Sequence, residues 1–345
     1  MRFQHVRIAA IAHALPEERV LSQELEHRLL PLYERLSLRV GRLELMSGIR
    51  ERRFWPRGTL PSTAAALAGE AALQRSGVPP DRIGCLIHAA VCRDFLEPAT
   101  ASVVHARLGL SERCQVFDLS NACLGMLNAM VVIAGMIERG EIEAGLVVSG
   151  EDARPLVEAT IEDLLASRGS DADLRSKLKQ AFASLTIGSG AAAIVLERGD
   201  AGQRLLGGAV LAASEHHVLC QGDRDASSTG PLMATDAEAL LEAGSELAAR
   251  TFALLQAELG WTQASIERVV THQVGSAHRR ALFARLELDP ALDFPTVETL
   301  GNTGSAALAI SWSLARESGF LRAGQRLALF GIGSGLHCAM LGVEA

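Results

Sequence analysis

Short apolar runs alternate along the chain with longer helical stretches that are rich in alanine and leucine. Runs of this kind lie at residues 82–91, 144–151, 191–197, 268–273 and 326–333. Because they are brief, apolar and separated by helical segments, they are typical of buried strands. The alternation therefore predicts an α/β protein.

The two halves of the chain repeat one theme. Each opens with a strand-like run, at residues 5–14 and 205–214, passes through a long helical segment, and later presents a strand that ends in reactive or glycine-rich residues. This repetition suggests an internal duplication. We divide the chain into halves at residues 1–185 and 186–345, with a crossover strand near 186–197.

A polar segment separates the halves. Residues 158–183 have helical character and charges of alternating sign, which predicts an exposed helical excursion. The segment holds the only lysines of the sequence, Lys177 and Lys179. Lysines on a solvated face are poorly suited to Schiff-base chemistry, which needs a desolvated amine.

Composition narrows the function. The 345 residues are 48% hydrophobic, enough for a large aliphatic core, and the net charge of -7 argues against nucleic-acid binding. His13 interrupts the apolar start, which favours a strand over a signal peptide. Residues 126–136 are apolar but too short to span a membrane, so a buried helix is expected.

The cysteines have no C-x-x-C pair and no regular spacing, which argues against a disulfide framework or a zinc site and favours a cytoplasmic protein. They are Cys85, Cys92, Cys114, Cys123, Cys220 and Cys338.

Cys123 has a distinctive setting. Residues 115–135 predict a strand over 116–119, a tight turn of small residues, and a helix that opens near Cys123. Free N–H groups and the positive end of the helix dipole would favour a thiolate there. A free cysteine is more commonly a buried structural thiol, but the turn context favours a nucleophile.

Two more polar residues have comparable settings. His272 follows the strand-like run 268–270, and Asn302 lies between glycines before another apolar helix. Alone, the first could be a structural histidine and the second a simple turn residue. Together with Cys123 they form the layout of a nucleophile with two oxyanion donors.

The segments SNACLGM, THQVGS, GNTGSAA and GIGSGLHCAM resemble, in order and context, the ketoacyl synthase III branch of the thiolase superfamily. The resemblance implies a duplicated five-layer αβαβα sandwich, a homodimer, and coenzyme A thioester substrates without cofactor or metal. It also implies that Cys123 is acylated, that His272 and Asn302 activate the second thioester, and that Gly335 supplies a backbone N–H beside that of Cys123.

Several arginines are candidates for the coenzyme A phosphates. The segment 48–54 resembles the mouth of the family's coenzyme A tunnel, which suggests Arg50 or Arg53, with Arg52 an alternative. Arg279, with Arg280, is a further candidate, although exposed helical arginines are more often solvated. Residues 274–280 depart from the pattern of synthases that dock acyl carrier protein, which puts carrier docking in doubt.

The segment RDFLEPATAS places Glu97 before a proline and is similar to a loop of olefin-pathway condensing enzymes (OleA type). In those enzymes the matching glutamate enters the partner subunit's site as a base. Joining two acyl-CoA chains without loss of carbon dioxide requires removal of an α-proton, and an apolar tunnel would raise the carboxyl pKa toward a useful range. Otherwise Glu97 is a surface acid.

The leading hypothesis is therefore non-decarboxylative Claisen condensation of two fatty acyl-CoA molecules to a 2-alkyl-3-oxo acid, in an olefin or β-lactone pathway with downstream enzymes as partners. The alternatives are decarboxylative condensation with a malonyl thioester, an acyltransferase or thioesterase on the same fold, and a non-catalytic partner subunit.

Overall fold

The computed structural model describes residues 1–223 and 230–345, and these residues build a nine-stranded central sheet. From one edge to the other its strands are β11 (Arg268–Thr271), β12 (Arg326–Gly333), β13 (His337–Glu344), β8 (Arg204–Ala212), β1 (Val6–Ala14), β7 (Gly190–Arg198), β6 (Ala144–Glu151), β4 (Ile83–His88) and β5 (Gln115–Asp118).

The strand order repeats. From β1 through β7, β6 and β4 to β5, successive pairs are antiparallel, antiparallel, parallel and parallel. From β8 through β13 and β12 to β11, the pairs are antiparallel, antiparallel and parallel, and Asp293 then bridges β11 in parallel, at the place of β5. The two sets meet through Arg7 and Arg204. The repeated order is that of a duplicated unit.

β7 lies between β1 and β6, so it belongs to the strands of the first half. The division at residues 185 and 186 rests on sequence alone, and we propose from the strand order that the halves meet after Arg198.

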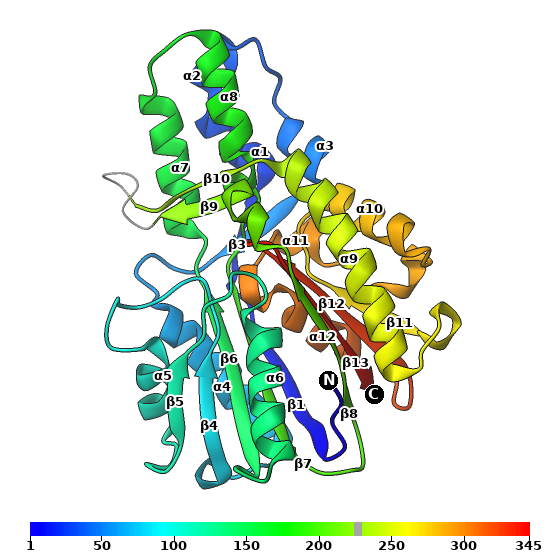
Figure 1. Ribbon diagram of the computed structural model, residues 1–345. Coiled ribbons are helices and arrows are strands. Elements are labelled where there is room, and N and C mark those ends of the chain that lie inside the picture. Colours follow the sequence, from blue (N-terminus) through cyan, green and yellow to red (C-terminus); the bar gives the residue numbers. More distant parts are fainter. Residues whose placement is uncertain (224–229) are drawn as a thin grey trace.

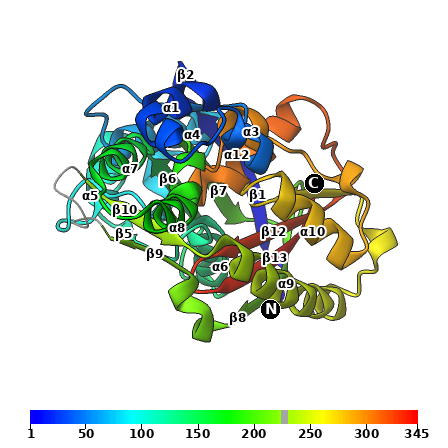
Figure 2. The same cartoon turned by 90° about the horizontal axis from the view of Figure 1, so that it is seen from above.

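Helices cover both halves of the sheet and fill the space between them. They are α4 (Pro61–Ser76), α5 (Thr100–Leu108), α6 (Gly125–Glu138), α9 (Ala237–Leu259), α10 (Ser276–Leu286) and α12 (Ala307–Glu317). α4 packs on β1, β6 and β7, and α9 packs on β8 and β13. α6 and α12 share one hydrophobic core with both halves of the sheet. Figure 2 shows α5 and α9 on opposite sides of the molecule.

Three hydrophobic cores match these layers: one between α4, α5 and the first half, one around α6 and α12, and one between α9, α10 and the second half. The expected duplicated five-layer αβαβα sandwich is confirmed. The apolar stretch expected to form a buried helix is α6, most of whose residues are inaccessible to solvent.

A cap of helices stands above the carboxyl ends of the strands (Figure 1). Its elements are β2 (Glu18–Leu21), α1 (Ser22–Arg28), α2 (Leu30–Arg35), α3 (Arg42–Ser47), β3 (Glu51–Phe54), α7 (Arg154–Ala166) and α8 (Asp171–Ala181), with the hairpin β9 (Cys220–Asp223) and β10 (Leu232–Thr235) beneath. The predicted excursion is helical as expected, and α8 is largely exposed. Its inner side nevertheless joins α1, α2 and α7 in a core of their own.

Short elements complete the chain. α11 (Val297–Leu300) precedes α12, and 3-10 turns are η1 (Pro80–Arg82), η2 (Phe182–Thr186), η3 (Ser214–Leu219), η4 (Gln263–Ser265), η5 (Pro290–Leu292) and η6 (Gly304–Ala306). Over the described ranges, we find no helix with the length and apolar character needed to cross a membrane.

Candidate active site

Cys123 lies in the turn between β5 and α6. The preceding residue, Ala122, has a φ of 45°, a left-handed conformation that costs a non-glycine residue about 1–3 kcal/mol. Asn121 holds this turn from both sides. Its carbonyl accepts the N–H of Leu124 at 3.0 Å, its amide donates to Asn128 at 2.6 Å, and its Oδ1 pairs with His337 Nδ1 at 2.9 Å. The strained turn is thus fixed by two contacts with the start of α6 and by one long-range contact with His337.

The glycine-rich end of β12 passes directly beside Cys123. A Cβ at Gly333 would lie 3.5 Å from the backbone N of Cys123 and 3.2 Å from Leu124, and a Cβ at Gly331 would lie only 2.5 Å from Leu127. Glycine therefore allows this strand to approach the start of α6. Gly335, the predicted second donor, follows in the same hairpin and lies beside the His337 ring.

The ionisation of Cys123 differs from the sequence expectation. Burial raises the pKa of its thiol to about 12, and the neighbouring Glu151 and Cys220 add to the rise. The side chain retains partial solvent access, but its sulfur is densely surrounded. The helix N-terminus was expected to favour a thiolate. The low dielectric of the site and the acidic neighbour outweigh that dipole, so the resting group is a thiol.

This pKa leads to a first prediction. The rate of Cys123 alkylation by iodoacetamide should rise about tenfold per pH unit from pH 7 to pH 9, because the thiolate fraction stays small throughout that range. Peptide mass spectrometry would measure the rate, with Cys123→Ala identifying the labelled peptide. A rate that levels off below pH 8 would contradict the buried-thiol description.

His272 lies just beyond β11. Its backbone N–H donates to the carbonyl of Phe330 at 2.8 Å. Burial lowers the pKa of its imidazole to about 4, and the nearby His278 contributes to the drop. Its Nδ1 has no hydrogen-bond partner among the described residues. A neutral ring at pH 7 bears one N–H and can donate it to a thioester oxygen.

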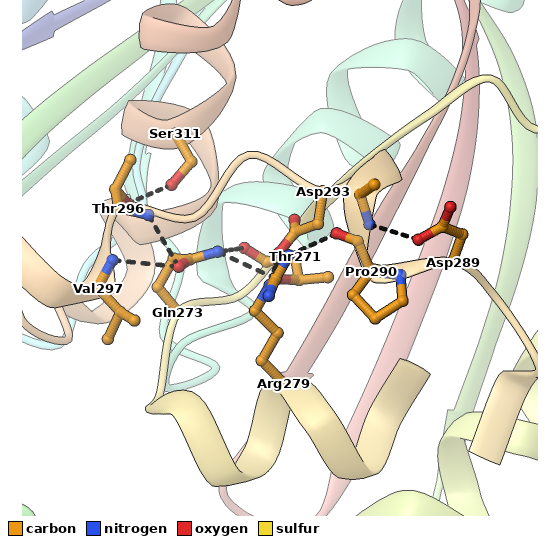
Figure 3. A network of polar contacts seen from close by, with 10 residues as sticks. Thr271, Gln273, Arg279, Asp289, Pro290, Asp293, Thr296, Val297 and Ser311 are labelled. Atoms are coloured by element: carbon orange, nitrogen blue, oxygen red, sulfur yellow. Dashed lines mark hydrogen bonds and ion pairs between the residues drawn. The ribbon is translucent and has the colours of Figure 1, made fainter. Parts of the chain in front are cut away.

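Gln273 connects the strand that carries His272 to the segment that leads to Asn302 (Figure 3). Its Nε2 donates to the carbonyl and hydroxyl of Thr271, each at 3.0 Å, and its Oε1 accepts the N–H groups of Thr296 and Val297 at 3.1 and 3.2 Å. A buried side chain with donors and acceptors satisfied in this way is a rigid link. It fixes the start of α11 relative to β11.

Asn302 is held by its backbone on both sides. Its backbone N–H donates to the carbonyl of Thr186, and its carbonyl accepts the N–H of Gly188. Glycine is needed at position 188, because a Cβ there would lie 2.0 Å from the carbonyl oxygen of Leu300. Its Oδ1 accepts the N–H of Gly304 at 3.0 Å. This contact orients the amide so that its NH₂ group remains as a donor.

The same turn packs on the helix that follows Cys123. The hydroxyl of Ser305 accepts the N–H of Met126 in the first turn of α6 at 3.0 Å. A Cβ at Gly125 would lie 2.8 Å from that hydroxyl. The turn of Asn302 therefore contacts the start of α6, and β12, the neighbour of β11, contacts it from another side. The three predicted residues belong to one packed region.

Glu97 lies outside this region of the chain. It is exposed in the loop 91–99, where Val91, Phe95 and Leu96 are 56%, 44% and 87% exposed. The base of the loop is nevertheless fixed. The N–H of Asp94 donates to the Thr100 hydroxyl at 3.1 Å, and the Asp118 carboxylate accepts the N–H of Thr100 at 2.9 Å.

The arginines divide into two groups. Arg52 is buried and donates to Ser22 and Leu185, so it holds the cap. Arg53 donates to the Pro16 carbonyl. Arg279 pairs with Asp293 at 2.6 Å and donates to the Pro290 carbonyl at 2.5 Å. These contacts occupy part of its guanidinium group within the protein. Arg50 and Arg280 are exposed.

Sequence reasoning did not single out Glu151, Gln273 or Ser305. The available signals were a carboxylate that ends the apolar run 144–151, an amide directly after His272, and a serine after the Asn302 turn.

Over the described part of the chain, no group of three or more His, Cys, Asp or Glu side chains is arranged to hold a metal ion.

Comparison with known proteins agrees with the fold. Residues 117–214 match the model of 3-oxoacyl-[acyl-carrier-protein] synthase III, and residues 256–344 match that of its C-terminal part. An acyl-CoA:acyl-CoA alkyltransferase from Shewanella oneidensis is 39% identical, with all of both chains covered, and one from Xanthomonas campestris is 39% identical over 99% of this chain and 98% of its own.

Solved structures extend the similarity. A cysteine-to-serine variant of OleA from Xanthomonas campestris, with bound lauric acid and lauroyl-CoA, has a TM-score of 0.93 and 38% identity over 99% of this chain and 100% of its own. A β-ketoacyl-[acyl-carrier-protein] synthase III from Cereibacter sphaeroides is more distant, at 27% identity over 95% of each chain. The chain therefore belongs to the thiolase superfamily, in its 3-oxoacyl-[acyl-carrier-protein] synthase III branch, and within that branch to the OleA type.

Proposed function

We propose that this protein is an acyltransferase that joins two fatty acyl-CoA molecules by non-decarboxylative Claisen condensation through a thioester on Cys123. The observation that carries the proposal is the presence of a glutamate at position 97, at a defined spacing before Cys123. In the solved OleA variants the substituted glutamate precedes the substituted cysteine by the same number of residues as Glu97 precedes Cys123. A carboxylate supplied in this way replaces decarboxylation as the source of the carbanion.

In the first half-reaction the Cys123 sulfur attacks the thioester carbonyl of one acyl-CoA. The carbon–sulfur bond to coenzyme A breaks, and the thiol proton leaves with the coenzyme A sulfur. The backbone N–H groups of Cys123 and Gly335 would stabilise the oxyanion, and the loss of one such donor costs about a hundredfold to a thousandfold in rate.

In the second half-reaction a base removes the α-proton of another acyl-CoA, whose thioester oxygen accepts hydrogen bonds from His272 and Asn302. The carbanion attacks the acyl carbon on Cys123, and the Cys123 sulfur leaves and takes up a proton equivalent to the one that the base removed. The product is a 2-alkyl-3-oxoacyl thioester, which water hydrolyses to the acid. The neutral ring of His272 suits this role as a donor.

The base would be Glu97 of the partner subunit. Its exposed loop supports this assignment, because Val91, Phe95 and Leu96 present apolar surface that a second subunit would cover. We propose a homodimer on these grounds. We also propose a cytoplasmic location and downstream pathway enzymes as partners. Arg50 is the first candidate for contact with coenzyme A.

The test is incubation of the purified protein with palmitoyl-CoA alone. We expect release of free coenzyme A beyond one equivalent per site and a condensed product identified by mass. A protein that remains silent until a malonyl thioester is added, and then releases labelled carbon dioxide, would be a decarboxylative synthase. An acyl group transferred to an alcohol or amine, or a free fatty acid, as the sole product would instead indicate a non-condensing acyltransferase or a thioesterase.

The base of the loop gives a second prediction. Thr100→Val removes the hydroxyl that accepts from Asp94, and the loss of one such bond should slow condensation about fivefold through a less ordered Glu97. Acylation of Cys123 should be unaffected. The matched control is Thr160→Val, which removes a buried hydroxyl within α7. Equal slowing of acylation and condensation would count against a role confined to the loop.

A further inference from the structure

Glu151 is a buried carboxylate at the centre of the site with no part in the chemistry described above. It ends β6 and is only 4% exposed. Within the described chain, three backbone N–H groups donate to it: those of Val91 at 3.0 Å, Cys92 at 3.1 Å and Ser305 at 3.0 Å. Hydrogen bonds to a carboxylate are roughly twice as strong as neutral ones, so this arrangement is a firm anchor.

These donors come from segments that are distant in sequence, and each segment leads to a predicted site residue. Ser305 ends the turn of Asn302 and holds the first turn of α6 through Met126. Val91 and Cys92 begin the loop that carries Glu97. The turn lies directly against the carboxylate, because a Cβ at Gly304 would be 2.8 Å from Glu151 Oε1.

Glu151 also acts on Cys123 electrostatically. Burial is the main reason why the pKa of Cys123 is raised, and the charge of Glu151 is the next. Burial also raises the pKa of Glu151 itself, but the N–H donors of Val91 and Ser305 oppose that rise and favour the anion. Two other titratable groups face this pair: Cys220, at the start of β9, acts on Cys123, and the Cys92 thiol interacts with Glu151.

We propose that Glu151 is a positioning residue, whose carboxylate joins the Asn302 turn, the helix start behind Cys123 and the base of the Glu97 loop into one unit and places a negative charge near Cys123. The part that concerns Glu97 rests on the proposed function. The part that concerns Cys123 and the Asn302 turn does not.

The test variant is Glu151→Gln, which keeps the shape but removes the charge and places an NH₂ group against a backbone donor. Two effects of opposite sign follow. Alkylation of Cys123 by iodoacetamide at pH 8 should become about tenfold faster, because a like charge nearby is removed and the thiolate fraction rises. Condensation of palmitoyl-CoA should become about tenfold slower, because the buried N–H groups lose an acceptor.

The matched control is Glu26→Gln. Glu26 is also a buried carboxylate that accepts two backbone N–H groups, from Gly41 and Leu43, but it lies in the cap. Its replacement should leave the rate of Cys123 alkylation at pH 8 unchanged. A purely structural disturbance would raise that rate equally in Glu151→Asp, which retains the charge.

An unchanged alkylation rate at pH 8 in Glu151→Gln, an equal rise in Glu151→Asp, or unchanged condensation in Glu151→Gln overturns the proposal. If Glu151→Gln does not fold, Glu151→Asp retains the charge but withdraws the carboxylate, so the alkylation rate should stay and condensation should fall; unchanged condensation there also overturns the proposal. If the wild type does not condense acyl-CoA at all, the proposed function fails, and the alkylation rates still decide the role of Glu151.

Discussion

Glu97→Ala should abolish carbon–carbon bond formation and leave acylation of Cys123 intact. The variant retains the thiol and its surroundings, but it lacks a base for the α-proton, a loss that typically costs a hundredfold to about ten-thousandfold in rate. With palmitoyl-CoA we expect a burst of about one equivalent of coenzyme A per site followed by near silence. Peptide mass spectrometry would find the acyl group on Cys123. Glu112→Ala, at an exposed glutamate outside the loop, is the control and should turn over normally.

Mixed dimers make this prediction sharper. In a heterodimer of Glu97→Ala and Cys123→Ala, one site combines an intact Cys123 with an intact Glu97 from the other subunit. Random pairing of the two inactive variants should therefore restore about a quarter of wild-type activity, since half of the dimers are mixed and each has one complete site. Absence of recovery in a mixture shown to contain heterodimers would mean that Glu97 acts within its own subunit or not at all.

Cys123→Ala should remove both half-reactions, because no covalent intermediate can form. We expect condensation to fall at least about ten-thousandfold, in line with the loss of a nucleophile that acts as a unit with its oxyanion donors. The measurements are product mass and retention of radiolabelled acyl group on the protein. Cys220→Ser is the informative control, because it removes the neighbouring sulfur without touching the nucleophile. Retained acyl label in the Cys123→Ala variant would assign the acylation to another residue.

Several elements of the fold follow from local sequence pattern. The apolar runs predicted β4, β6 and β12 because buried parallel strands are nearly continuous in apolar residues. The strand, small-residue turn and apolar helix around Cys123 were read correctly for the same reason, since each feature is a property of neighbouring residues.

Other features depend on contacts between distant residues. The placement of β7 beside β1, and the packing of the excursion against α1 and α2, follow from which faces bury each other. Arg52 had been grouped with the arginines beside the tunnel mouth, but it is buried as part of the cap. Its burial depends on Ser22 and Leu185, which no local pattern connects to it.

Periodicity and short segments were therefore enough to predict the α/β class, the duplication and the family motifs. The charge state of the site, in contrast, depended on the folded chain. A thiol at a helix start was expected to ionise readily, yet dense packing around the sulfur and the charge of Glu151 hold it protonated. The dielectric environment of a group and its distance to other charges depend on the whole fold. The role of Glu151 therefore became visible only when the folded chain placed residues 91, 123, 151 and 305 together.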